Sequence, residues 1–180
     1  MKALHDLVQS GKVHYIGASS MWTYQFAQMQ FIAEKNGWTK FVSMQNRYNL
    51  CYREEEREMN KFCQETGVGL IPWGPLYHGL LAKPLGKESS RSQQAKAMSG
   101  GLTEADEETI RRVEELAGKK DGKMSQVALA WIREKGCIPI VGATVERLDE
   151  LCASRDLRLT AEEVKYLDEP YVPKAVAGHV

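Results

Sequence analysis

The unit from which this chain is built first appears as Lys12-Val13-His14-Tyr15-Ile16-Gly17-Ala18-Ser19-Ser20, followed by Thr23–Lys35. The apolar run over residues 12–17 predicts a short strand. In the second part, apolar residues recur at helical spacing until Asn36-Gly37, a typical helix stop. Ser19 or Ser20 stands where a helix N-cap is expected. The unit is therefore a strand followed by a helix.

The same alternation recurs through the rest of the chain. Three more apolar runs predict strands over residues 40–45, 68–73 and 137–142. Further helices are expected over residues 53–66, from Thr103, from a cap at Ser125, and over residues 146–153 and 161–167. A loop rich in Gly, Ser, Lys and Gln spans residues 74–102, and an extended tail spans residues 168–180. Short apolar strands that alternate with helices predict an α/β fold with a parallel sheet, in a single domain over residues 1–180.

Composition excludes several classes of protein. The 180 residues carry 24 Lys and Arg against 24 Asp and Glu, so no basic surface indicates nucleic acid or an anionic membrane as partner. No apolar run approaches the roughly 20 residues that cross a bilayer, and the N-terminus has no signal-like core. The four cysteines show neither metal-like spacing nor a reason to form disulfides. We therefore expect a cytoplasmic protein without a metal site.

Small or polar residues stand at the carboxyl end of each predicted strand. These are Ser19-Ser20, Gln45-Asn46, Gly74-Pro75 and Ala143-Thr144. Ligand sites of parallel α/β proteins collect at that edge, although Gly and Ser are also common in ordinary strand-to-helix turns. The pattern alone leaves both interpretations open.

The motifs of the chain, taken in order, resemble the aldo-keto reductase family, especially its larger microbial and fungal members. The resemblance is carried by residues 12–20, Gln45–Asn49, Tyr52–Glu56, Ile71–Leu76, Ser125–Trp131 and Ile138–Gly142. It implies a (β/α)8 barrel, a fold that typically takes about 250 residues. A chain of 180 residues is similar to barrel strands five to eight with their helices. The resemblance thus implies a partial barrel that lacks the first four strands.

The resemblance also implies NADP(H)-dependent interconversion of aldehydes or ketones with alcohols. The family's catalytic aspartate, tyrosine, lysine and histidine precede the part of the family that this chain matches, so no catalytic residue is assigned and the chain alone is expected to be inactive. Tyr77 and His78, which stand where relatives often have Ala-Arg, form a neighbouring pair in the long loop. They are either a substitute for the missing groups or, more simply, loop residues.

The half of the family that matches is the one that binds the nicotinamide cofactor. The resemblance places Ser19, Ser20 and Gln45 on the carboxamide, Trp73 against the nicotinamide ring, and Arg147 near the adenosine 2′-phosphate. It also places a loop with small residues along the pyrophosphate, which contains Gly74, Leu76 and Gly79. Each has a plainer alternative as a helix cap, a strand end, a core residue or a surface charge.

Two arginine positions qualify the cofactor assignment. Arg91 in the long loop is a second candidate for the 2′-phosphate. The turn before Arg147 is one residue shorter than in relatives, which would rotate the next helix by about 100°.

A half barrel leaves two sheet edges and an inner face uncovered, so we expect a homodimer or pairing with a complementary N-terminal half. Two alternatives to the family activity stay open. One is a cofactor-binding or regulatory module without turnover. The other is different chemistry on the same scaffold.

Overall fold

Strands and helices alternate along the chain in the computed structural model, which describes residues 1–87, 89, 93 and 101–179. In order, with η for a 3-10 turn, the elements are α1 (Lys2–Gln9), β1 (Gly17–Ser19), α2 (Thr23–Lys35), β2 (Ser43–Gln45), η1 (Glu54–Arg57), α3 (Met59–Thr66), β3 (Gly69–Leu70), η2 (Tyr77–Ala82), α5 (Glu104–Lys119), α6 (Met124–Glu134), η3 (Val145–Arg147), α7 (Leu148–Ala153) and α8 (Ala161–Asp168). The α/β class is confirmed. No helix within these described ranges has the length and apolarity to cross a membrane.

The three strands form one parallel sheet in the order β1-β2-β3. Ala18 pairs with Met44 and Met44 with Leu70, and all three side chains are buried. They share a core with Phe26 of α2 and Cys63 of α3. Because side chains alternate along a strand, the residues on either side of these three point to the opposite face. One face of the sheet is therefore covered by helices, and the other face carries the side chains of the candidate site described below.

The predicted fourth strand is present as an extended segment beside β3. The N–H of Ile138 donates to the carbonyl of Leu70 at 2.9 Å, and that of Ile140 donates to the carbonyl of Pro72 at 2.9 Å. In a regular parallel ladder residue 72 would donate back, but proline has no N–H. The ladder is interrupted there, so the prediction of a regular strand over residues 137–142 is wrong.

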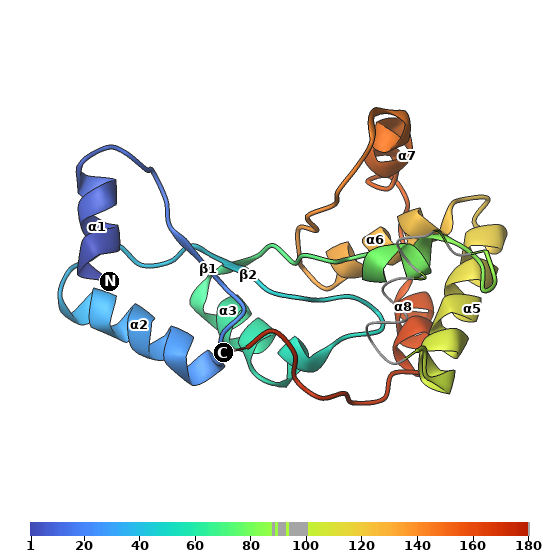
Figure 1. The fold of residues 1–180 in the computed structure, drawn as a ribbon, viewed down its shortest axis with the longest axis horizontal. Helices are drawn as coiled ribbons and strands as arrows, with labels where there is room; N and C mark the ends of the chain where they lie inside the picture. The colour runs from blue at the N-terminus through green and yellow to red at the C-terminus, as the bar shows by residue number, and fades with distance from the viewer. Residues whose placement is uncertain (88, 90–92, 94–100, 180) are drawn as a thin grey trace.

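The other strands are shorter than predicted. β1 begins at Gly17, so the strand predicted over residues 12–17 is displaced toward the C-terminus. Before it, the carbonyl of Ile16 accepts a bond from Val42 N–H at 3.0 Å, and the chain then diverges toward α1 (Figure 1). The apolar pattern marked residues that become buried, whereas strand length follows the hydrogen bonds that neighbours supply.

Helix α2 covers Thr23–Lys35 as predicted, but the predicted cap is wrong. Neither Ser19 nor Ser20 caps it. The helix begins after Trp22, whose N–H donates to Oε1 of Gln25 at 3.3 Å. A glutamine one turn inside the helix thus satisfies the first free N–H.

Helix α6 has the same arrangement. It begins after Lys123, whose N–H donates to Oε1 of Gln126 at 2.9 Å, so Ser125 lies inside the helix and is not its cap. The Ser125 hydroxyl instead donates to Glu150 at 2.5 Å and joins α6 to α7.

The helix predicted over residues 53–66 is divided. The turn η1 ends at Glu58, whose backbone (φ −146°, ψ −49°) is not helical, and α3 begins at the next residue. The turn directs two carboxylates inward, because both Glu54 and Glu55 are buried. These carboxylates need partners, and the end of the chain supplies them.

The C-terminal tail runs back from α8 toward the strands (Figure 1). Oε1 of Glu54 accepts the hydroxyl of Tyr171 at 2.5 Å and the N–H of Lys174 at 2.6 Å, while Oε2 accepts Arg57 Nε at 2.5 Å. Burial raises the pKa of Glu54, but these three donors outweigh it and hold the pKa below its ordinary value.

The last residues of the tail contact the segment that follows β2 in the sequence. Ala177 N–H donates to the hydroxyl of Tyr52 at 2.9 Å, and that hydroxyl donates to the Ala177 carbonyl at 3.2 Å. Nε2 of His179 lies 2.9 Å from Oε1 of Glu55, and its ring meets that of Trp22 edge-on at 4.9 Å. The tail is therefore a fastened part of the fold.

Helix α6 forms the centre of the helical half of the molecule. Its side chains from Met124 to Ile132 are buried except for Gln126, in contact with α5 on one side and with α7 on another. Trp131 is fully buried, and its ring lies 5.2 Å from that of Tyr48. This contact joins the helices to the segment that follows β2.

Asp168 at the end of α8 accepts three donors from different parts of the chain. Trp131 Nε1 lies 2.9 Å from Oδ1, Arg53 Nη1 lies 2.8 Å from the same oxygen, and Lys135 Nζ lies 2.6 Å from Oδ2. Arg53 is also paired with Glu56 at 2.7 Å. The carboxylate joins α6, α8 and η1.

We predict that Asp168→Asn lowers the free energy of unfolding by about 2 kcal/mol, because it leaves two largely buried cations without their shared partner. Urea unfolding followed by circular dichroism measures the change. The matched control is Asp6→Asn, which removes an exposed pair with Lys2 and is expected to cost less than about 0.5 kcal/mol. Equal losses in the two variants would contradict the role of Asp168.

We also predict that part of the stability is lost on acidification through Glu54. Because its pKa is lowered in the folded chain, Glu54 stabilises the fold above its ordinary pKa, and this contribution disappears as the pH falls through the lowered value. Between about pH 7 and about pH 3.5 the wild type should lose more unfolding free energy than Glu54→Gln. The exposed Glu58→Gln should behave as the wild type. An equal loss in all three proteins would contradict the prediction.

Candidate functional site

Polar and aromatic side chains share the uncovered face of the sheet at the carboxyl ends of the strands. Ser19 pairs with Gln45 across β1 and β2, and Arg47 pairs with Trp73 just beyond them. The N–H of Ile140 bonds the carbonyl that precedes Trp73, which places Ile140 beside it. Paired residues of neighbouring strands point to the same face. These five residues thus stand in two rows on one face.

Hydrogen bonds bring four of the residues from the sequence analysis together. The Ser19 hydroxyl donates to the carbonyl of Gln45 at 2.6 Å, and Ser20 N–H donates to the same carbonyl at 3.2 Å. Trp73 Nε1 donates to the hydroxyl of Ser20 at 3.4 Å. The hydroxyl oxygens keep acceptor capacity, and the Gln45 side chain carries both a donor and an acceptor. A planar amide needs both kinds of group.

The candidate residues line two separate hollows. One, with a volume of about 420 Å³, is lined by Ser19 and Ser20 together with residues of α2. Another, of about 430 Å³, is lined by Trp73, Gly74, Leu76, Gly79 and Arg147. Ser20 and Trp73 connect the two through their hydrogen bond. Gln45 lines neither of these hollows, although it lies on the same face.

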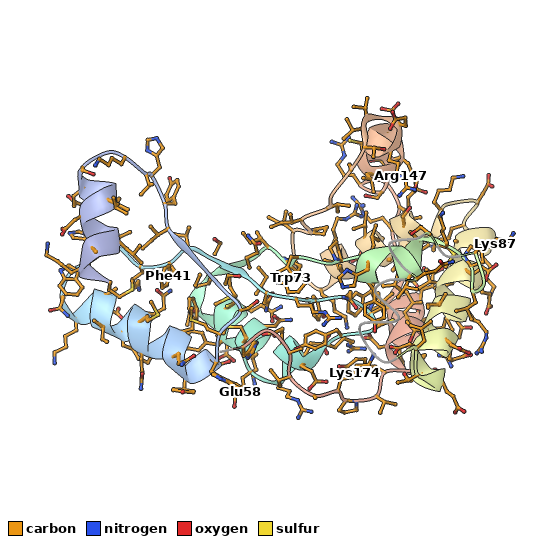
Figure 2. The ribbon with its side chains drawn as sticks, viewed as in Figure 1. Phe41, Glu58, Trp73, Lys87, Arg147 and Lys174 are labelled. Atoms are coloured by element: carbon orange, nitrogen blue, oxygen red, sulfur yellow. The ribbon has the colours of Figure 1, made fainter. Side chains whose placement is uncertain are left out.

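Arg147 lies at the end of η3 and is exposed. It borders the hollow that contains Trp73, and also a neighbouring one of about 440 Å³ that Ser125 and Glu150 line. Figure 2 shows it on the segment that carries α7, apart from Trp73 at the middle of the molecule. The other arginine candidate, Arg91, lies outside the described residues.

The turn after β3 has a backbone that the sequence did not predict. Three successive residues are left-handed: Tyr77 (φ 47°), His78 (φ 57°) and Gly79 (φ 92°). Only glycine adopts this region without strain, so the first two store roughly 1 kcal/mol or more each. Such strain typically marks a loop that is shaped for a ligand.

The same turn separates the side chains of the Tyr-His pair. Tyr77 is buried, His78 is exposed at the edge of the hollow that contains Trp73, and their ring centroids lie 6.3 Å apart. Burial raises the pKa of Tyr77, and the nearby charge of Lys174 offsets part of that rise. A tyrosine that transfers protons near neutral pH needs the opposite shift. The geometry therefore favours loop residues over a catalytic pair.

Arg47 is a member of this face that the sequence analysis missed. Its guanidinium carbon lies 4.6 Å from the ring centroid of Tyr52, 5.7 Å from that of Tyr77 and 6.0 Å from that of Trp73. The alternation of side chains along a strand would have identified it, because Arg47 is two residues after Gln45 and therefore points to the same face. The ring partners come from distant segments and had no signal of their own.

The family model described as "Aldo/keto reductase family" matches residues 1–171 of the chain. The chain is also similar to curated proteins of fungi. An aldo-keto reductase of Fusarium vanettenii is 50% identical over 184 residues, which cover 99% of this chain and 50% of the relative.

Two further relatives carry more specific names. A putative aryl-alcohol dehydrogenase of Schizosaccharomyces pombe is 50% identical over 186 residues, covering 100% of this chain and 57% of the relative. The versiconal hemiacetal acetate reductase of Aspergillus parasiticus is 50% identical over 183 residues, covering 98% of this chain and 53% of the relative. The chain spans about half the length of the curated relatives that it matches.

Proposed function

The chain belongs to the aldo/keto reductase family of oxidoreductases, and we propose that it supplies the cofactor half of an enzyme that interconverts aldehydes or ketones with alcohols. The observation that carries the proposal is the bonded group of Ser19, Ser20, Gln45 and Trp73 on the uncovered face. The cofactor is NADP(H), which supplies or accepts the hydride when it is bound. The name of the Schizosaccharomyces pombe relative suggests aromatic alcohols and aldehydes as substrates.

In the proposed barrel, β1, β2, β3 and residues 137–142 correspond to strands five to eight. The parallel order of the three strands and the hydrogen-bonded fourth segment support this correspondence. The side of the sheet that carries Gln45 and Trp73 would then face the barrel interior at its carboxyl end, where ligands of such barrels bind.

Each residue has a task in the proposed site. Ser19, Ser20 and Gln45 hold the carboxamide of the nicotinamide, because together they offer donors and acceptors to one planar amide. Trp73, whose ring is oriented by its bond to Ser20, lies against the nicotinamide ring and determines which face of it meets the substrate.

The cofactor phosphates would lie along the turn after β3. Gly74 (φ 64°) and Gly79 (φ 92°) leave open space where a Cβ would stand, and Leu76 lies between them. A phosphate can therefore approach the backbone of this turn closely. Arg147 borders the same hollow and would bind the 2′-phosphate through two parallel bonds.

Carbonyl reduction also needs a general acid, and we assign none to this chain. The acid would come from a complementary N-terminal half, so the chain alone is expected to bind cofactor without turnover. The alternative is a cofactor-binding or regulatory module without turnover. The two differ in one outcome: adding a complementary N-terminal half restores carbonyl reduction in the proposed enzyme and does not do so in the module.

We further propose that, without a complementary N-terminal half, the uncovered face and its edge associate with a second copy of the chain. Tyr15, before β1, is 77% exposed, and Ile138, beside β3, is 70% exposed. Large apolar side chains this open, together with a strand edge, favour association.

We predict that NADPH binds saturably to the purified chain and quenches tryptophan emission. Trp73→Ala should weaken binding about tenfold or more, since it removes the ring platform, and Arg147→Ala should weaken NADPH more than NADH, since only NADPH carries the 2′-phosphate. The control is Trp38→Phe, at the far end of α2 from the site, which should leave the dissociation constant unchanged. No saturable binding of NADPH up to about 1 mM would overturn the proposed site.

We predict that sedimentation velocity gives the mass of a dimer. Ile138→Asp should shift the chain toward the monomer, because it places a charge on the uncovered face. Phe31→Asp is the matched control, since Phe31 is exposed on the outer side of α2. A compact monomer at all concentrations, or equal dissociation by both variants, would contradict association through the sheet face.

A further inference from the structure

Arg47 is surrounded by three aromatic rings at the end of β2. The distances from its guanidinium carbon to the ring centroids are 4.6 Å for Tyr52, 5.7 Å for Tyr77 and 6.0 Å for Trp73. Tyr52 and Tyr77 are buried, whereas Arg47 and Trp73 are only half-buried. The cation therefore lies on an aromatic platform that is open on one side.

The charge of Arg47 has no anionic partner within the described part of the chain. Other arginines that are at least partly covered have one or more acceptors: Arg53 binds Glu56 and Asp168, and Arg112 binds Glu108 and Glu169. The guanidinium of Arg47 contacts the three rings, and among the described residues no carboxylate pairs with it. Contacts to ring faces attract a cation but leave the in-plane N–H groups without acceptors.

Hydrogen bonds hold the Arg47 backbone and the ring of Tyr52 in place. The Arg47 backbone is fixed between two bonds, Trp73 N–H to the carbonyl of residue 46 at 2.9 Å and the N–H of residue 48 to the Trp73 carbonyl at 3.4 Å. The Tyr52 hydroxyl is held by Ala177. On the ring of Tyr77, the second cation is Lys174 (5.4 Å to the centroid), whose own charge is met by Asp106 at 2.5 Å. The net positive charge of this cluster therefore belongs to Arg47.

We propose that Arg47 binds the carboxylate of a substrate, and that the chain acts on organic acids. A guanidinium offers a carboxylate two parallel N–H bonds in its plane, and stacking on rings orients it in advance. A partly desolvated cation without an acceptor is costly, and a bound carboxylate removes that cost. The inference rests on the proposed function in one respect: Trp73 marks where the reacting part of the cofactor lies.

A carboxylate is favoured over a phosphate by the surroundings. The guanidinium of Arg47 is surrounded by aromatic rings, and its single charge matches that of a carboxylate better than that of a more highly charged phosphate. The phosphates of the cofactor are assigned to the turn that contains Gly74 and Gly79, where the backbone is open to close approach. Arg47 therefore serves the substrate and not the nucleotide.

The test is a titration with benzoate, followed by tryptophan emission and by calorimetry in the absence of cofactor. Benzoate should bind the wild type, and its uncharged counterpart benzamide should bind at least about tenfold more weakly. Arg47→Met, which keeps an unbranched apolar side chain but removes the guanidinium, should lose about tenfold or more in affinity for benzoate and none for benzamide. Arg47→Lys should fall between the two, because lysine keeps the charge but not the two parallel bonds.

Three controls make the outcome decisive. Arg155→Met removes an exposed arginine elsewhere and should bind benzoate as the wild type does. Urea midpoints show whether each variant is folded; if Arg47→Met is not, the comparison of benzoate with benzamide on the wild type still decides. Inorganic phosphate is titrated in parallel, and displacement of benzoate at equal concentration would assign Arg47 to phosphate instead.

The inference and the proposed function fail separately. Equal affinity of the wild type for benzoate and benzamide, or unchanged benzoate binding in Arg47→Met, overturns the carboxylate site even if NADPH binds. Absence of NADPH binding overturns the proposed function even if benzoate binds at Arg47. A loss of NADPH affinity in Arg47→Met as large as the loss for benzoate would place a cofactor phosphate at Arg47.

Discussion

The carboxylate of Asp168 determines how the two halves of the molecule meet. It accepts Trp131, Lys135 and Arg53, and so joins the helices to the segment after β2. The backbone N–H of Arg53 in turn donates to the hydroxyl of Tyr171 at 2.9 Å, where the tail begins its return. From there the tail reaches Tyr52, which underlies the guanidinium on the uncovered face. One polar network thus connects the last helix to the candidate site, although the two lie more than 100 residues apart in sequence.

The parts of this arrangement that follow from sequence are those in which a local pattern and the tertiary environment agree. α2 was predicted with both of its limits, because Phe26 and Ala33 recur at helical spacing on the face that packs on the core and Asn36-Gly37 ends the helix. Thr103 was predicted to open α5, and its hydroxyl accepts the N–H of Asp106. The order of strands and helices, and with it the α/β class, followed from the same signals. In these places each local preference agrees with the fold.

The rest depends on partners that no local pattern contains. The serine caps were wrong because Gln25 and Gln126 reach back first, and the fourth strand was wrong because Pro72 cannot return a hydrogen bond. The left-handed backbone at Tyr77 and His78 goes against the preference of both residues, so only the surrounding contacts explain it. In the candidate site, the resemblance to the family identified the residues that have a counterpart among the cofactor-binding positions of the family. It missed Arg47, whose setting is made by rings that lie five, twenty-six and thirty residues further along the chain.

The two rows on the uncovered face also limit how the length of this chain can vary. Gln45 and Arg47 point outward because they are an even number of residues apart, whereas Asn46 and Tyr48 between and after them are buried. Deleting or inserting one residue within β2 would exchange the two sets and place an amide and a phenol where the ligand groups now stand. Changes of one residue are therefore excluded from this strand and belong in the turns between the elements.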